Sequence, residues 1–288
     1  MLTGTVTSVI ATRNRRPELC ATLERLSALP ERPAIIVVDN GSRDGTAEAV
    51  RCGFPHVELI SLRRNLGACA RNVGVRRAET PYVALSDDDS WWEPGALSAA
   101  TAVLDASPGT GIVAAAIMVG PEATPDPINA LMAASPLSQG FLPGPRVLGF
   151  LGCAAVARRQ AYLAVGGYSR LLFIGGEEEL LAYDLAAKGW PISYREDIVA
   201  HHWPSQARDA RRRRVQEIRN RVLVAWLRRP VPHAIGNTLR LARMAGQDPV
   251  AGRALAETLL RLPAALLLRR RLPTGVEADI RLLESNRA

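Results

Sequence analysis

The feature that most constrains the fold is an alternation of short apolar segments with amphipathic ones over the first hundred residues. The apolar segments predict strands at residues 5–11, 34–39, 57–62 and 82–86. The segments between them predict helices at 16–29, from Asp44 onward and at 66–78. Strands that are apolar throughout and alternate with helices predict a mostly parallel sheet covered on both faces. We therefore expect an α/β fold whose ligands bind at the carboxyl ends of its strands.

The remainder of the chain changes in character twice. Residues 121–146 are rich in Pro, Gly and Ser and predict a long loop, which in a compact domain often covers a substrate. A strand (152–158), two helices (160–165 and 177–188) and closing strands within 191–201 are expected next, followed by helices at 207–229, 233–247, 250–268 and 276–285. We expect an α/β domain over residues 1–206 and a basic, amphipathic helical tail over residues 207–288.

Charge is distributed unevenly. The net charge of +8 divides into +11 for residues 201–288, with 18 arginines against 7 acids, and −3 for the remainder. Such asymmetry is typical of a tail that meets an anionic partner, either a phospholipid surface or a nucleic acid. Packing of these helices on the catalytic domain, or in a dimer, is the equally weighted alternative. The sequence has no apolar run of the roughly 18–20 residues that span a bilayer. Its first residues lack a basic region before an apolar stretch, so no secretory signal is expected. A cytoplasmic protein is expected, with peripheral binding to the inner face of the membrane left open.

An acidic triplet, Asp87-Asp88-Asp89, follows the fourth expected strand. Adjacent carboxylates repel each other, and a divalent cation relieves that repulsion. In an extended segment Asp87 and Asp89 point the same way, so both can face one ion. A solvated turn before the next helix explains the triplet equally well.

Four further groups are candidates for the same edge of the sheet. Asp39 ends the second strand, where an acid can accept a hydrogen bond from a nucleotide, although turn chemistry alone also favours Asp there. Arg71 can neutralise the acids or hold a phosphate. The glutamates 177–179 suit a general base, and the first turn of a helix also favours acids. His201 and His202 can supply a nitrogen ligand, although such a pair is more often structural. Cys20, Cys52, Cys69 and Cys153 are interpreted as buried or incidental thiols.

The order of the motifs resembles a known family. No GxGxxG follows a strand and no GxxxxGK[ST] occurs, which disfavours a dinucleotide-binding fold and excludes a P-loop enzyme. Family 2 glycosyltransferases with a GT-A fold, in particular rhamnosyltransferases, are similar over roughly residues 5–229. The segments that carry the resemblance are VIATRNRRPEL, VVDNGSRDGT, NLGACARNVGVRRA, VALSDDDSWWEPGAL, GGYSRLLFIGGEEELLAYDLAAKGW, and HHWPS followed by RRRRVQEIRN.

The resemblance implies a role for each matching residue. Asp39 would contact the nucleotide base, and Thr12 and Arg13 would lie near the nucleoside. Asn65 and Arg71 would lie near the nucleotide, and the triplet would be the DxD motif, with Asp87 and Asp88 near the donor and Asp87 and Asp89 on the metal ion. The base motif falls on Glu177-Glu178, with Glu178 where the family usually has Asp, so the base stays open among Glu177, Glu178 and Glu179. His201 matches the histidine near the metal, and His202 remains an alternative.

The implied reaction is inverting transfer of a sugar from a nucleoside diphosphate-sugar to a hydroxyl group, assisted by Mn²⁺ or Mg²⁺. The acceptor is expected to be a cell-envelope saccharide or a lipid-linked glycan. A sugar nucleotidyltransferase is the rival enzyme, but the segment after the first strand, ATRNRRPEL, lacks the glycine-rich phosphate loop that it would need. A nucleic-acid-binding protein that uses the arginine-rich tail is the rival outside enzymes. No nucleic acid is expected as a partner, because the tail lacks interleaved stacking aromatics.

Overall fold

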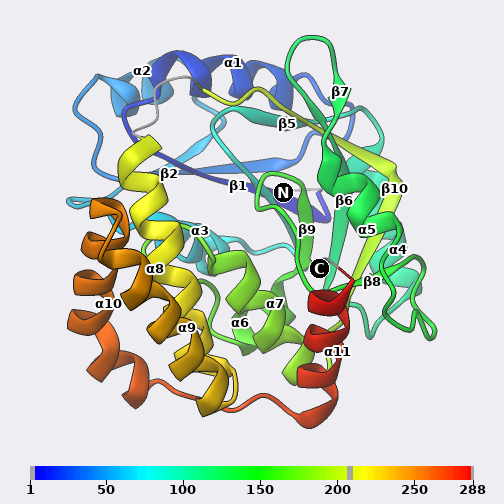
Figure 1. Cartoon of the computed structure of the whole chain (residues 1–288). Helices are drawn as coiled ribbons and strands as arrows, with labels where there is room; N and C mark the ends of the chain where they lie inside the picture. The colour runs from blue at the N-terminus through cyan, green and yellow to red at the C-terminus, as the bar shows by residue number, and fades with distance from the viewer. Residues whose placement is uncertain (1–3, 206–209, 287–288) are drawn as a thin grey trace.

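The computed structural model describes residues 4–205 and 210–286. Its centre is a ten-stranded sheet with helices on both faces, as predicted (Figure 1). The four N-terminal strands are parallel and lie in the order β3-β2-β1-β4. Their bounds are Val6–Thr12 for β1, Ala34–Asp39 for β2, Glu58–Ser61 for β3 and Tyr82–Ser86 for β4. Parallel pairing brings the polar residues that follow β1, β2 and β4 to one edge of the sheet.

The second half of the sheet is mixed. Strand β9 (Ala155–Arg158) lies between β4 and β6 (Ile112–Val119) and is antiparallel to both. The sequence could not predict this direction, because an apolar segment does not encode which way its strand runs. Strand β10 (Ile192–His202) pairs with β6 in parallel and is one strand where two segments were expected, with a bulge between Arg195 and Val199. The short strands β5 (Ser90–Trp92), β7 (Thr124–Pro125) and β8 (Arg146–Val147) pair antiparallel at the margins.

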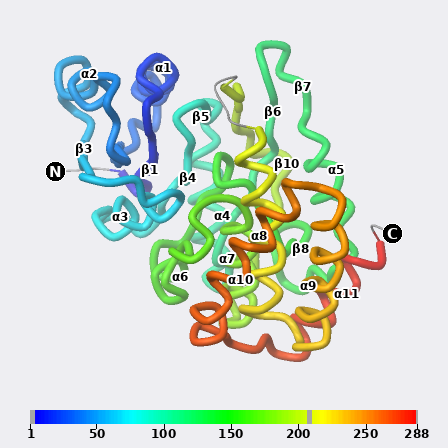
Figure 2. Tube along the Cα trace, turned by 60° about the vertical axis from the view of Figure 1, so that its left-hand side comes forward, coloured from blue at the N-terminus to red at the C-terminus, as the bar shows by residue number. Residues whose placement is uncertain are grey.

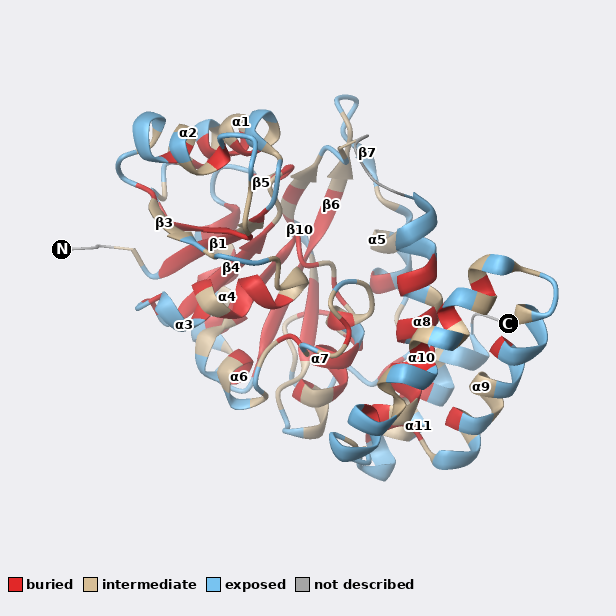
Figure 3. Cartoon of the chain, turned by 90° about the vertical axis from the view of Figure 1, so that its left-hand side faces the viewer, coloured by how far each residue is buried: buried red, intermediate tan, exposed pale blue. Residues whose placement is uncertain are grey.

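Helices cover both faces of the sheet. On one face lie α1 (Arg16–Ser27), α2 (Thr46–Gly53) and α4 (Ala96–Ala106). On the other lie α3 (Ala70–Arg77), preceded by the 3₁₀ helix η1 (Gly67–Cys69), and α6 (Arg159–Ala164) and α7 (Glu177–Ala187). The apolar residues Leu19, Leu23 and Leu26, spaced for one helix face, are fully buried against the sheet. Figure 3 shows the sheet as the most buried layer of the molecule.

The segment expected to be a loop contains a helix, α5 (Pro127–Ala133). Its start has ordinary helix chemistry, since the Asp126 side chain accepts a hydrogen bond from the backbone N–H of Ile128 and proline occupies the first helical position. The only other elements in 121–146 are the two-residue strand β7 and the first residue of β8, Arg146. The long-loop prediction is therefore wrong for residues 127–133.

The C-terminal helices pack beside the sheet domain (Figures 1 and 2). They are α8 (Ala210–Arg228), α9 (Val231–Ala245), α10 (Pro249–Leu267) and α11 (Thr274–Ser285). Leu223 and Val224 of α8 share an apolar cluster with Leu180 and Tyr183 of α7, so α8 is a packed helix, which was one of the alternatives for the tail. The predicted boundary between residues 206 and 207 lies outside the described residues. Within the described residues, each helix is too short or too polar to cross a membrane.

Candidate active site

The ends of β1, β2 and β4 meet through a chain of hydrogen bonds. Thr12 and Asp39 are register partners on neighbouring strands. The Thr12 hydroxyl donates to Asp88 Oδ2 at 2.8 Å, and its carbonyl accepts from the backbone N–H of Asn40 at 2.8 Å. These contacts bring Thr12, Asp39 and the acidic triplet to one edge of the sheet. Arg13 is exposed beside them.

The turn after β2 is held by hydrogen bonds that join the side chains of one aspartate and two asparagines to the backbone. Asp39 is buried, and its Oδ1 accepts from the backbone N–H of Ser42 at 2.9 Å, so one carboxylate oxygen is used by the turn. The Asn40 amide bonds to the backbone of Leu66 and Gly67. Asn65 Oδ1 accepts from the Gly67 N–H at 2.9 Å. Asn65 therefore shapes the start of η1.

Each carboxylate of the triplet has different partners. Asp87 forms an ion pair with Arg71. Asp88 accepts from Thr12 and lies 4.0 Å from an Arg15 nitrogen. Asp89 is 3.5 Å from the same Arg15 nitrogen and accepts from the backbone N–H of Ser205 at 3.1 Å. Burial, followed by the charge of Asp89, raises the pKa of Asp88 to about 7.

The two histidines point to different places, because successive residues of a strand face opposite sides. His202 Nε2 lies 3.3 Å from Asp89 Oδ1. His201 stacks on the Trp91 ring, with centroids 5.4 Å apart, and its Nε2 lies 3.0 Å from Glu93 Oε1. The structure thus brings His202 to the acids and leaves His201 on the other side of the strand.

The donor set beside the triplet fits a divalent cation. Ligand atoms of Asp87, Cys153 and His202 all lie within 4.8 Å of one another, and Asp89 adjoins His202. Burial raises the pKa of the Cys153 thiol well above its ordinary value. Thiol sulfur is a soft ligand, whereas Mn²⁺ and Mg²⁺ prefer oxygen ligands, so Cys153 is left out of the set. Two carboxylates and an imidazole remain, a set that suits Mn²⁺ or Mg²⁺.

Arg71 joins the triplet to the glutamates of α7. It is buried, donates from Nη2 to the Ser86 carbonyl at 2.8 Å, and its guanidinium carbon lies 6.0 Å from the centre of the Tyr168 ring. A Cβ placed on Gly152 would lie 2.8 Å from Arg71 Nη1 and 2.9 Å from Glu178 Oε1. Arg71 and Glu178 therefore approach each other over a position where only glycine leaves room.

The three glutamates have distinct surroundings. Glu178 Oε1 accepts from the backbone N–H of Gly152 at 3.1 Å. Burial raises the pKa of Glu178, and the charge of Asp87 raises it further. Burial and the charge of Glu178 raise the pKa of Glu177 to about 8. Glu179 is exposed and accepts from the Tyr183 hydroxyl at 2.7 Å. Glu178 is thus the member of the set that faces Asp87 and Arg71.

The backbone before these glutamates is held by the C-terminal helices. Gly175 and Gly176 have φ angles of +87° and +82°. Asn220 of α8 is fully buried and donates from Nδ2 to the carbonyls of Leu172, Ile174 and Gly175 at 2.9, 2.8 and 2.5 Å. Helix α8 therefore fixes the segment that leads into α7.

Sequence reasoning missed several of these residues. Arg15 lies three positions after β1, and its closeness to two carboxylates had no distinct signal among the three arginines in ATRNRRPEL. Cys153, interpreted from the sequence as a buried or incidental thiol, is buried but also lies beside the candidate metal ligands. The buried Asn220 had a usable signal, since it is a polar residue between the apolar positions Ile218 and Val222 of one helix.

Comparison with known proteins establishes the family. The model of glycosyl transferase family 2 matches residues 7–166, more than half of the chain. The chain belongs to glycosyl transferase family 2. The N-acetylglucosaminyl-diphospho-decaprenol L-rhamnosyltransferase of Mycobacterium tuberculosis is 27% identical over 244 residues, which are 72% of this chain and 80% of the relative. The prediction of a rhamnosyltransferase-like member of family 2 is confirmed.

Solved structures share the fold. The mannosyltransferase PcManGT of Pyrobaculum calidifontis, in complex with GDP-Man and Mn²⁺, has a TM-score of 0.61 at 21% identity and covers 98% of this chain and 86% of its own. Residues 1–349 of TarS from S. aureus, in complex with UDP-GlcNAc, have a TM-score of 0.58 at 16% identity. The match covers 98% of this chain and 87% of the TarS chain. The predicted GT-A-type α/β fold with a helical C-terminal region is confirmed.

Proposed function

We propose that this family 2 protein catalyses inverting transfer of a sugar from a nucleoside diphosphate-sugar to an acceptor hydroxyl, with Mn²⁺ or Mg²⁺ as cofactor. The observation that carries the proposal is the approach of Glu178 to Arg71 and Asp87, residues that are far apart in the chain. A cation-binding acid and a candidate base on one edge of a nucleotide-binding sheet are the two parts that the reaction needs. Family membership favours sugar transfer over the nucleotidyltransferase alternative.

The donor nucleotide is proposed to bind at the ends of β1, β2 and β4. Asp39 contacts the base and Thr12 and Arg13 the nucleoside, while Asn65 and Arg71 lie near the diphosphate together with Asp87 and Asp88. The structures of PcManGT and TarS are complexes with GDP-Man and UDP-GlcNAc, which supports a nucleotide-sugar donor. Asp87, Asp89 and His202 would hold the cation, and the cation would neutralise charge on the departing diphosphate. His201 is left out of the ligand set, because its imidazole faces Glu93.

The chain's own residues perform the remaining work. Glu178 accepts the proton of the acceptor hydroxyl, whose oxygen forms a bond to the anomeric carbon as the bond from that carbon to the diphosphate breaks. One displacement of this kind inverts the anomeric configuration. The raised pKa of Glu178 makes its carboxylate a stronger base near neutral pH. Arg71 holds Asp87 and positions the triplet.

The test compares two glutamates of the same helix turn. Glu178→Gln is expected to lower kcat by about 10²–10⁴-fold while the Kd for the donor changes little, since a base acts on the acceptor proton. Glu179→Gln is the matched control, because Glu179 is exposed and bonds to Tyr183, and it should keep normal turnover. Near-normal turnover of Glu178→Gln would remove this residue as the base. A thermal-shift screen of UDP-, dTDP- and GDP-sugars with Mn²⁺ identifies the donor.

We further propose a cell-envelope or lipid-linked saccharide as the acceptor and peripheral binding of this cytoplasmic protein to the inner face of the membrane. The Mycobacterium relative is named for a lipid-linked saccharide. Leu266, Leu267 and Leu268 are exposed directly before three arginines, a pairing that suits an interfacial helix end. Equal recovery of the protein from neutral and anionic vesicles would contradict the membrane proposal.

A further inference from the structure

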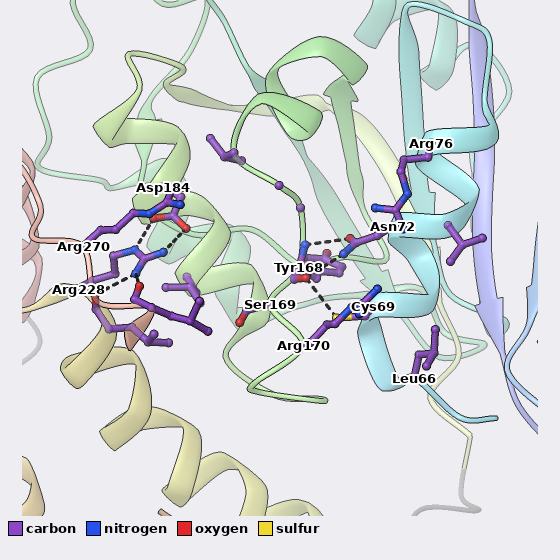
Figure 4. A pocket seen from close by; sticks show the side chains of 17 residues that line it. Leu66, Cys69, Asn72, Arg76, Tyr168, Ser169, Arg170, Asp184, Arg228 and Arg270 are labelled. Atoms are coloured by element: carbon purple, nitrogen blue, oxygen red, sulfur yellow. Dashed lines mark hydrogen bonds and ion pairs between the residues drawn. The ribbon is translucent and has the colours of Figure 1, made fainter. Parts of the chain in front are cut away.

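A pocket of about 350 Å³ lies beside α7, and none of the three carboxylates of the acidic triplet lines it. Its walls come from α3, the segment 165–170, α7, the end of α8 and residues 268 and 270 (Figure 4). This volume lies in the range of small-molecule sites. The pocket runs along the flank of α7, past Leu180 and Asp184, whereas Glu177 and Glu178 stand at the start of that helix.

Positive charge dominates the rim. Arg76, Arg170 and Arg270 come from three separate elements and are exposed. Over residues 4–205 and 210–286, these three guanidinium groups have no acidic partner within ion-pair distance, whereas most buried arginines of the chain are paired. Like charges around one cavity raise its positive potential, which an anion lowers.

Other polar groups that line the pocket already have hydrogen-bond partners within the protein. Arg228 is buried and binds the Asp184 carboxylate through two hydrogen bonds, of 2.5 and 2.8 Å. Asn72 donates to the Tyr168 carbonyl at 2.8 Å and accepts from the Tyr168 backbone N–H at 2.9 Å. These groups hold the shape of the cavity and leave the three rim arginines to meet a ligand.

The walls between the arginines are apolar. Val73, Val165, Leu180 and Leu227 line the cavity together with Leu268, which is 53% exposed at its mouth. Apolar walls lower the local dielectric and strengthen a guanidinium–anion contact. Three arginines from separate elements that line one cavity suit a ligand with several anionic oxygens, such as a phosphate or diphosphate, better than a single carboxylate.

We propose that this pocket is a binding site for a phosphate-bearing ligand, separate from the donor site. The inference goes beyond the proposed sugar transfer and does not depend on it. Both a soluble phosphate compound and an anionic lipid headgroup carry the required chemistry, and exposed leucines beside the mouth are compatible with either source.

Calorimetric titration of the full chain with inorganic pyrophosphate, in EDTA, tests the site. The triple variant Arg76→Gln, Arg170→Gln, Arg270→Gln changes only exposed side chains and should melt like the wild type. It is expected to lose one class of pyrophosphate site, with affinity weakened at least about ten-fold, because charge-assisted hydrogen bonds are removed. The matched control is Arg221→Gln, Arg240→Gln, Arg243→Gln, which removes the same charge from exposed positions outside the pocket.

The outcomes separate the pocket from general charge. Unchanged pyrophosphate binding in the pocket variant, or an equal loss in the control variant, overturns the proposal. Flotation with phosphatidylcholine vesicles, with and without phosphatidylglycerol, then distinguishes the source. Weaker flotation of the pocket variant than of the control identifies a lipid headgroup, and equal flotation of both identifies a soluble phosphate. Donor binding and turnover should stay unchanged in both variants, so failure here is distinct from failure of the proposed sugar transfer.

Discussion

Asn220 offers the sharpest test of how the C-terminal helices support the candidate site. Its amide donates to three carbonyls of the segment 172–175, and the side chain is fully buried. Asn220→Ala removes two N–H donors and leaves the carbonyls of Ile174 and Gly175 without this partner, whereas the Leu172 carbonyl still accepts from Arg219 Nη2 and from the backbone N–H of Ile174. Each buried unsatisfied group costs about 1–3 kcal/mol, while the better helix propensity of Ala returns roughly 0.5 kcal/mol. We expect a net loss of about 2–4 kcal/mol in the free energy of unfolding.

The same substitution should also lower activity. Gly175 and Gly176, both with positive φ, join the clamped segment directly to the first turn of α7. A shift of about 1 Å in a catalytic group costs on the order of 10²-fold in rate, so kcat should fall by about that factor. Urea unfolding followed by circular dichroism measures the stability, and initial rates at saturating donor measure kcat.

A matched substitution isolates the clamp. Asn237 lies in α9, is only partly buried, and its side chain bonds to the His233 and Arg240 side chains. Asn237→Ala brings the same gain in helix propensity without the loss of backbone partners, so it should change stability by less than about 0.5 kcal/mol. The reasoning is refuted if the two variants have equal stability and equal kcat.

Three more predictions follow from the site. Asp89→Ala should abolish turnover, and excess Mn²⁺ should not restore it. EDTA should abolish turnover of the wild type. Turnover of the variant, or turnover of the wild type in EDTA, would contradict the assignment of the acidic triplet as the metal site. Glu177→Gln should have a higher melting temperature than the wild type from about pH 5 upward, and the difference should grow with pH and become constant above about pH 8. The reason is that the pKa of Glu177 is raised from 4.5 to about 8 in the folded protein, so the wild type loses stability as pH rises through that range. A difference in melting temperature that does not change with pH would contradict this prediction. Gly67→Ala should destabilise the fold by more than about 2 kcal/mol in urea unfolding, since its φ is +62° and its Cβ would lie 2.1 Å from the Phe173 carbonyl oxygen, whereas Gly53→Ala, with open space around its Cβ, should be tolerated.

Much of the fold could be predicted from local patterns. Strands β2 and β4 occupy the residues expected for them, and the apolar spacing of Leu19, Leu23 and Leu26 gave the buried face of α1. The strand ends also indicated where polar chemistry collects. The helix within 127–133 was missed because its cap, Asp126-Pro127, is as typical of a loop as of a helix start. The direction of β9 was missed because its residues are apolar on both faces whichever way it runs.

The candidate site was predicted as a set of residue types rather than as a geometry. The choice among three adjacent glutamates rests on Gly152, which is brought from 26 positions away to bond Glu178. The choice between two histidines rests on the side of β10 that faces Asp89. Arg15 could not be ranked above its neighbours in sequence, and the polar position of Asn220 among apolar residues of α8 did not indicate its partners, since the partners of both residues lie on other elements.

The sequence by itself determined the alternating α/β architecture, the polar strand ends and the family, because these depend on periodicity and on the order of short motifs. Only the tertiary structure decided that Glu178 and His202 face the acids, that α8 holds the segment before α7, and that three arginines surround a second pocket. Those features depend on the pairing of segments distant in the chain, and local conformational preferences carry no information about which distant side chains will meet.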